Sequence, residues 1–585
     1  MSFHIIPSYV RCLVVAALVV SIVSSCSEDE IYKPVPNGDQ YVWDVQVTGM
    51  FCAAVWGGSA NDLFVVGRNG EILHYDGGSW RSMRSGVGSD LNAVWGSSGD
   101  NVFVATGNGT VVHYNGTAWY MDATGTSQEL TGIWGSSDHD IFAVGAGGTI
   151  VHYEGTFWSG MTSGTAAVLS DVWGTSPGNV YAAGRDGTIL HYDGSAWEAV
   201  TSGTTADLNC IWGSSETDIF AGGDGGTVLH YDGSDWSAMT SGTAGDINDI
   251  WGSSGNDVYA AMVGGSILHY DGIDWMVTIG PSSRAVRGLW GFGESDIVAV
   301  GDAGAVWHND GSGWSEMLYG TTAHINAVWG AVGGDVLAVG STGTVLSYDG
   351  SGWQAMTSGT ASDLFNLWGN SSSNIYAVGE HGTILQFDGT SWSVMPGTTS
   401  WRFWSIWGSS GGDIFAVGET GTIVHYDGSN WSLMTSGTAN GLYDVWGSSA
   451  NDVYAVGYWG IVLHYDGSAW NEMESGTGKH LYGIWGTSAS SIFVAGREGY
   501  ILHYDGEEWG AFDSGTTQNL YDIWGTTSRN VFAVGNVGVI VHYNGSEWNV
   551  LESGTRNLLR CVRGDTEGDI FVGGYNGTVL RCRND

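Results

Sequence analysis

The sequence is poor in charge, and above all in basic charge. Charged residues make up 13% of the chain, about half the share of an average protein. Only 17 of the 585 residues are Lys or Arg, against 60 Asp or Glu, which gives a net charge of −43. A field of this sign repels the phosphates of nucleic acids, so we expect no nucleic-acid partner.

Cysteine is also scarce, with six residues in the chain. The spacing contains no CxxC pair and no His/Cys cluster, so it predicts no metal site and no cofactor. Calcium is not indicated either, because no Asp-x-Asp-x-Asp-Gly loop is present. Export would permit disulfides, but we expect four buried single thiols at Cys52, Cys210, Cys561 and Cys582.

Apolar runs long enough to cross a membrane are missing as well. The apolar run Cys12–Val23 follows a single base, Arg11, and precedes small residues, which is typical of a signal peptide over residues 1–25. Val23 to Cys26 resembles a bacterial lipobox, so we expect Cys26 to be lipidated and residues 26–40 to form a tether. Ordinary signal-peptidase cleavage is the alternative. The segment predicts export and anchoring at the bacterial outer membrane, on its periplasmic or its outer side.

What the chain does contain is an internal repeat of 39 residues. A Trp-Gly pair returns at this interval from Trp56 to Trp524, and the fourteenth position holds Arg563 followed by Gly564. A second series of tryptophans runs at the same interval from Trp80 to Trp548. Most of the 31 tryptophans therefore belong to the scaffold.

One repeat contains four short apolar segments separated by glycine-rich turns. We predict strands over residues 91–95, 101–105, 110–114 and 119–122, with Asn115-Gly116 as a hairpin turn. Four short strands in about 40 residues are typical of a propeller blade. Residues 41–47 match the fourth strand of a blade, and the last repeat stops after its third. The first strand of the chain can therefore complete a blade and hide a sheet edge.

The repeats resemble those of WD40-type and Asp-box-type (BNR-type) β-propellers, and above all those of glycine- and tryptophan-rich bacterial propeller lipoproteins. The turn from His230 to Trp236 is similar to an Asp-box in place and composition, but it is one residue shorter between Asp and Trp. The resemblance covers residues 41–585. It implies an all-β fold of fourteen four-stranded blades.

Fourteen blades exceed the usual number of about four to eight in one ring. Arg287 and Arg560 stand at the same repeat position, seven repeats apart. This favours two seven-bladed propellers, residues 41–313 and 314–585, with a single fourteen-bladed ring as the alternative. In the favoured arrangement the Trp43 strand closes the first ring and the Trp314 strand closes the second.

Histidine recurs in the third strand of most repeats, close to Asp or Asn side chains. A His-Asp pair is a possible general base, but a catalytic site needs one asymmetric set of groups. Repetition in almost every blade instead indicates a structural hydrogen bond. We therefore predict a protein that is not an enzyme, with a propeller hydrolase or lyase as the less favoured class.

The position three residues before the Trp of each Trp-Gly pair separates the two halves of the chain. It is small or polar in most of the first seven repeats and aromatic in five of the next seven. Because this position begins the innermost strand, its side chains should surround the axial opening. Aromatic faces stack on sugars and cations, although such rings could also pack between blades. The predicted ligand-binding residues are Phe365, Trp401, Trp404, Tyr443, Tyr458, Trp459, Tyr482, Arg497, Tyr521 and Arg560, with Arg402, Lys479 and His480 in neighbouring loops.

Together these features predict an exported, lipid-anchored binding protein without catalytic activity. Its ligand is expected on the axial face of the second propeller and to be a glycan or a peptide. The alternative is a protein-binding scaffold or assembly factor for a complex of the cell envelope. In both cases the membrane is reached through the lipid anchor alone.

Overall fold

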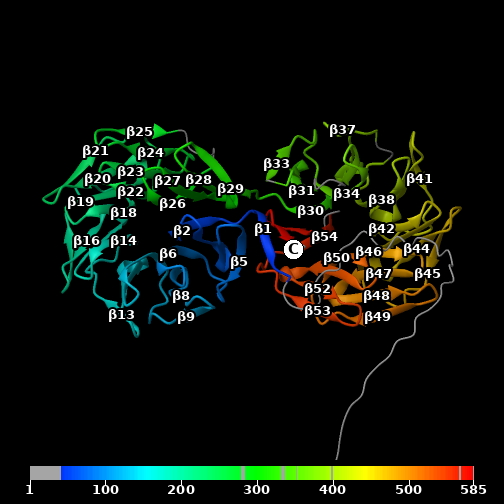
Figure 1. The fold of residues 1–585 in the computed structure, drawn as a ribbon, viewed down its shortest axis with the longest axis horizontal. Helices are drawn as coiled ribbons and strands as arrows, with labels where there is room; N and C mark the ends of the chain where they lie inside the picture. Colours follow the sequence, from blue (N-terminus) through cyan, green and yellow to red (C-terminus); the bar gives the residue numbers. More distant parts are fainter. Residues whose placement is uncertain are drawn as a thin grey trace, which may run out of the picture. The chain divides into compact units, whose positions relative to one another are not determined.

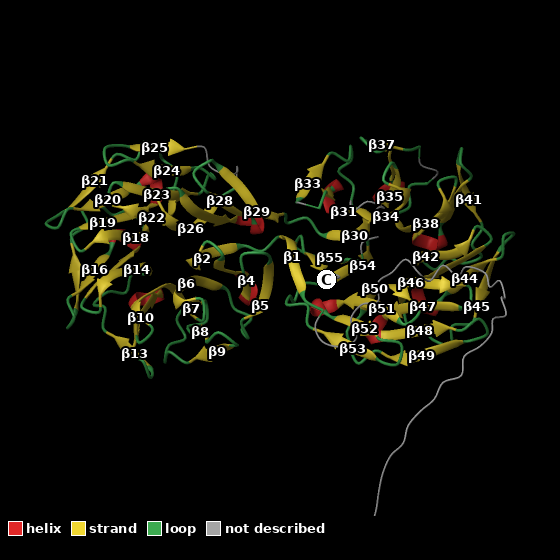
Figure 2. Ribbon diagram, viewed as in Figure 1, coloured by secondary structure: helices red, strands yellow, loops and turns green. Residues whose placement is uncertain are grey.

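The structure, a computed structural model, describes residues 41–278, 284–330, 336–350, 352–396, 399–565 and 568–583. Apart from three-residue 3-10 turns such as η1 (Arg68–Gly70), its regular elements are β-strands (Figures 1 and 2). No helix in these ranges is long and apolar enough to span a membrane. The predicted signal peptide, Cys26 and the tether lie outside the described residues.

Thirteen of the fourteen repeats form a four-stranded antiparallel blade, as predicted, and the last repeat supplies three strands of a blade that another strand completes. The second repeat consists of β6 (Leu91–Ser98), β7 (Asn101–Thr106), β8 (Val111–Tyr114) and β9 (Trp119–Asp122), paired in this order. The innermost strand is longer than predicted because it runs through the Trp-Gly pair to Ser98, which still pairs with Asn101.

The blades close into two rings of seven. In the first ring β26 packs against β2, and in the second β54 packs against β30, which excludes a single ring of fourteen (Figure 1). The innermost strands of the first ring are β2 (Cys52–Ser59), β6, β10 (Leu130–Ser137), β14 (Leu169–Ser176), β18 (Leu208–Ser215), β22 (Ile247–Ser254) and β26 (Val286–Gly293). Those of the second are β30 (Ile325–Gly330), β34 (Leu364–Ser371), β38 (Phe403–Ser410), β42 (Leu442–Ser449), β46 (Leu481–Ser488), β50 (Leu520–Thr527) and β54 (Leu559–Gly564).

The predicted assignment of the closing strands is wrong. Strand β1 (Trp43–Thr48) pairs with β56 (Val579–Cys582) and so completes the last blade of the second ring. Strand β29 (Trp314–Gly320) instead completes the last blade of the first ring, beside β28 (Val306–Asn309). The short turn between β28 and β29 explains this, because a tight hairpin costs less chain entropy than a distant pairing. The last repeat, in contrast, has no fourth strand of its own among the described residues.

The first ring is therefore inserted into the second, and a boundary at residues 313 and 314 divides a blade. The chain leaves β1 for the first ring and returns through β29. At this crossing the two strands run parallel, with Val47 opposite Tyr319 and Thr48 opposite Gly320. The first ring thus contains all its own strands, whereas the second depends on a strand from the start of the domain.

Successive blades contact each other where a tryptophan ring of one blade packs on a glycine of the next. In eleven of the blades the glycine of the Trp-Gly pair lies under the tryptophan ring of the preceding blade, and Gly564 of the last blade lies in the same way under Trp524. A Cβ atom on Gly96 would come within 2.8 Å of the Trp56 ring, and one on Gly291 within 2.3 Å of Trp251. At the closure of the first ring the Trp290 indole N–H donates to the Gly57 carbonyl at 3.0 Å. Only glycine permits this close approach of neighbouring blades.

Fragments of the chain test this closure. Residues 49–320 should fold alone, whereas residues 321–585 should form an open, less stable ring. Fusing residues 41–48 behind residue 585 should restore about 5 kcal/mol of stability, because Trp43, Val45 and Val47 are buried. Thermal unfolding and hydrogen exchange of β54–β56 measure the effect.

The matched control is the same fusion carrying Val45→Asp, which should not restore the ring. Equal stability of residues 321–585 with and without the fused strand would contradict this closure.

Candidate functional site

The residues predicted to face the second axis occupy a β-bulge. In most blades the register between the first two strands shifts at this position, so that Tyr443 is skipped between Leu442 and Asp444. The same shift skips Phe365, Trp404, Tyr482, Tyr521 and Arg560. A bulge re-aims the side chain of its extra residue, and here it directs each one toward the ring axis.

In the first ring this bulge position connects the blades. The amide N–H groups of Asn92, Asn209 and Asn248 donate to the carbonyls of Leu130, Ile247 and Val286 in the following blade, at 2.7–3.0 Å. Thr131 makes the equivalent bond to Leu169. Asn326 of the second ring also follows this pattern, with a bond of 2.8 Å to Leu364. The polar residues at this position are thus structural.

In the second ring five aromatic side chains replace these polar ones and form a continuous arc. Successive ring centroids lie 4.7 Å apart from Phe365 to Trp404, 5.9 Å to Tyr443, 5.1 Å to Tyr482 and 5.1 Å to Tyr521. The Arg560 guanidinium ends the arc, 5.4 Å from the Tyr521 centroid. These six residues and Asn326 line one axial cavity, which we call the aromatic opening.

The aromatic opening is shallow. Its cavity volume is about 50 Å³, well below the roughly 300–1,000 Å³ of a small-molecule pocket. The half-buried side chains therefore nearly close the axis, and a partner would have to contact the mouth of the ring.

Three further predicted residues extend the opening on its outer side. The Tyr458 ring lies 4.8 Å from Tyr443 and 5.1 Å from His480. Trp459 is 65% exposed, and its backbone N–H donates to His480 Nδ1 at 3.0 Å. Arg497 forms an ion pair with Glu498 at 3.3 Å.

Trp401 is half exposed but has no ring contact with the arc among the described residues. The neighbouring Arg402 contacts the arc instead. Its guanidinium lies 4.8 Å from the Trp404 ring and 2.7 Å from the Glu380 carboxylate.

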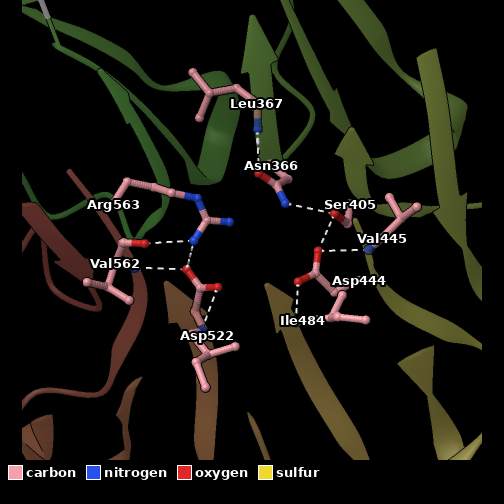
Figure 3. Close-up of polar contacts among 10 residues, drawn as sticks. Asn366, Leu367, Ser405, Asp444, Val445, Ile484, Asp522, Val562 and Arg563 are labelled. Atoms are coloured by element: carbon pink, nitrogen blue, oxygen red, sulfur yellow. Dashed lines mark hydrogen bonds and ion pairs between the residues drawn. The ribbon is translucent and has the colours of Figure 1, made fainter. Parts of the chain in front are cut away.

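A buried polar network beneath the arc was missed from the sequence (Figure 3). Asn366 donates to Ser405 at 2.9 Å, and Ser405 donates to Asp444. Asp522 accepts a bond of 2.7 Å from Arg563, which replaces the tryptophan of the other repeats. The sequence does contain a signal for this network. Polar residues recur two positions before the Trp of the Trp-Gly pair in four repeats of the second ring, at Asn366, Ser405, Asp444 and Asp522.

These carboxylates connect successive blades. Asp444 accepts from the backbone N–H groups of Val445 and Ile484, and Asp522 accepts from that of Val562 in the next blade at 2.8 Å. Burial and the charge of Asp522 raise the pKa of Asp444 to about 6, while Arg563 lowers it. In the first ring burial raises the pKa of Asp249 to about 8 and that of Asp171 to about 6.

The repeated histidines have the structural role that the sequence predicted. His152 Nε2 lies 2.6 Å from Asp140 Oδ1, and Ser136 donates to the other oxygen of Asp140. In a catalytic triad the histidine stands between the nucleophile and the acid. Here the aspartate stands between them, so the histidine cannot take the serine proton.

Three cysteines in the described part of the chain are shielded from solvent. Cys52, Cys210 and Cys561 are buried single thiols, as predicted. Burial raises the pKa of each, that of Cys561 to about 12. Within the described ranges no group of three or more His, Cys, Asp or Glu side chains could hold a metal ion.

Comparison with known proteins gives a match of fold alone. No family model matches the chain, and no curated protein matches it. A solved structure described as YCF48 bound to D1 peptide is similar, with 16% sequence identity and a TM-score of 0.40. The match covers 47% of this chain and 97% of that one.

The polar network predicts a pH-dependent loss of stability in Arg563→Met. Removing the cation leaves Asp522 and Asp444 without a positively charged partner, which should cost about 3 kcal/mol of stability at neutral pH. Arg563 lowers the pKa of Asp444, so in the variant this pKa lies above the wild-type value of about 6. The variant therefore goes on losing stability as the pH rises above 6, where the wild type no longer does. The stability gap to the wild type should therefore widen from about pH 5 to about pH 8.

Urea unfolding across this range measures the gap. Arg529→Met, at an exposed arginine, is the control and should change stability little. A gap that does not depend on pH would contradict the proposed charge balance.

Proposed function

We propose that this protein is a non-catalytic binding protein that docks an extended segment of a partner protein on the aromatic opening of its second ring. The observation that carries the proposal is the arc from Phe365 to Tyr521. Four of the seven equivalent positions of the first ring instead hold side chains that donate hydrogen bonds to the next blade: Asn92, Thr131, Asn209 and Asn248. Packing requirements are the same in both rings, so they do not account for this segregation.

The geometry of the arc favours a peptide over a glycan. A sugar stacks on a flat, accessible aromatic face. Here neighbouring rings are inclined to one another by 42–69°, which makes an uneven surface of ring edges. Trp, Tyr and Arg, the residue types gathered here, are also those that dominate binding energy at protein interfaces.

Trp459 supports a binding role over packing between blades. It is 65% exposed and adopts a left-handed backbone conformation with φ of 57°, which costs a bulky residue about 1–3 kcal/mol. Gly147 and Gly225 occupy the same turn position in two other blades. The Trp459 ring contacts the His480 ring at 4.6 Å. Glycine serves the same turn position in those two blades without such a ring, so we assign the advantage of this exposed side chain to binding.

Export and lipidation at Cys26 remain part of the proposal on the evidence of residues 1–26 alone. An anchored propeller with a docking face would suit a scaffold or assembly factor of the cell envelope.

The substitution Trp459→Gly separates binding from folding. It relieves the strained backbone, so stability should stay equal or rise slightly, while binding of the full chain to an array of short synthetic peptides should weaken roughly tenfold. Asp186→Gly is the matched control, because it makes the same change seven repeats earlier in the first ring and should leave binding unchanged.

Neutral oligosaccharides printed on the same array test the other ligand class. Binding to them that depends on Trp459 would support the glycan alternative. Array binding that is indifferent to Trp459→Gly and to Trp404→Ala would place the docking site elsewhere.

A further inference from the structure

Arg287 and Arg560 stand at equivalent positions of the two rings but have different surroundings. In the first ring Arg287 Nε lies 3.1 Å from Asp302 Oδ1, and its guanidinium lies 5.1 Å from the Phe51 ring. The arginine is therefore neutralised by an acid of its own blade.

The second ring keeps the arginine and replaces its neighbours. Seven repeats after Asp302 stands Tyr575, and seven repeats after Phe51 stands His324. The rings of His324 and Tyr575 stack on each other at 4.1 Å, inclined by 11°. Among the described residues no carboxylate forms an ion pair with Arg560, whose guanidinium lies against the Tyr521 ring.

Other basic side chains around the aromatic opening have acidic partners. Arg402 pairs with Glu380 at 2.7 Å, and Lys479 pairs with Glu498 at 3.3 Å. In a chain of net charge −43, a half-buried arginine that has lost its acid is an exception. Its planar guanidinium can bind a carboxylate with two parallel hydrogen bonds.

We propose that Arg560 is the carboxylate-binding subsite of the aromatic opening and that the docked peptide segment is acidic. This inference rests on the proposed function and adds the chemistry of the ligand. The carboxylate takes the place that Asp302 fills in the first ring, and an adjacent apolar group of the peptide lies against Tyr521 and Tyr482. The carboxylate belongs either to a Glu or Asp side chain or to a free C-terminus.

The test uses the full chain and an array of synthetic peptides printed in matched forms. Each sequence carries Glu or the neutral Gln, and ends in a free carboxylate or an amide. The wild type should prefer the acidic forms by roughly tenfold. A preference for Glu over Gln identifies a side-chain carboxylate, and a preference for the free end over the amide identifies a C-terminal one.

Two variants test the subsite, one by removing the arginine and one by supplying it with an acidic partner. Arg560→Gln removes the cation, and Tyr575→Asp rebuilds the ion pair of the first ring while keeping the arginine. Both should abolish the preference for acidic forms and leave binding of the neutral forms in place. Tyr575→Asn has nearly the shape of Asp without its charge and should keep the preference.

The outcomes separate this inference from the proposed function. Peptides that bind in a Trp459-dependent way, but equally well as Glu and Gln forms, would overturn the carboxylate subsite and leave the docking face intact. An array without any peptide whose binding depends on Trp459 or Trp404 would overturn both. Loss of the preference in Tyr575→Asn as well would show that the tyrosine, and not the charge, is responsible, and would also overturn the subsite.

Discussion

The contact of a tryptophan ring with a glycine of the next blade determines most of this structure. The indole covers the glycine so closely that a Cβ atom would overlap it, as at Gly291 beneath Trp251. Each blade therefore reaches its neighbour at a fixed distance, and the same step repeats until the ring closes. The contact returns once in each 39-residue repeat, so the strands and turns between two such contacts keep the same length from blade to blade.

The tryptophan-glycine contact joins neighbouring blades, and the repeated His-Asp bonds join two strands within each blade. The bulge at the start of each inner strand is therefore free to vary. The first ring uses it for bonds such as that from Asn209 to Ile247. The second ring replaces most of these bonds with aromatic rings, and the buried carboxylates of Asp444 and Asp522 connect its blades from below. The second ring thus lacks most of the blade-to-blade hydrogen bonds of the bulge position, and it lacks them at the surface where we propose the docking site.

The last blade shows how a departure from the repeat creates local chemistry. Arg563 takes the place of the repeated tryptophan and donates a hydrogen bond to the Asp522 carboxylate in the axial cavity. Arg560 keeps the arginine of the seventh blade but loses its acidic partner, because Tyr575 replaces the aspartate. This blade is also the one completed by β1 from the start of the domain, so its sequence is not bound to the pattern of a self-contained blade.

The sequence by itself determined the strands, the blades and the aromatic positions, since these depend on a local pattern repeated every 39 residues. The residues from Phe365 to Arg560 could be aligned without knowing any contact, and they do line one opening. Which strand closes which ring was predicted wrongly, because β1 could pair with the last blade of either ring and only the pairing with β56 decides between them. The bulge that turns each side chain to the axis, the polar network beneath it and the unpaired state of Arg560 also required the tertiary structure. These features depend on residues that lie from one blade to several hundred residues away in the sequence, and a local sequence pattern contains no information about contacts over such separations.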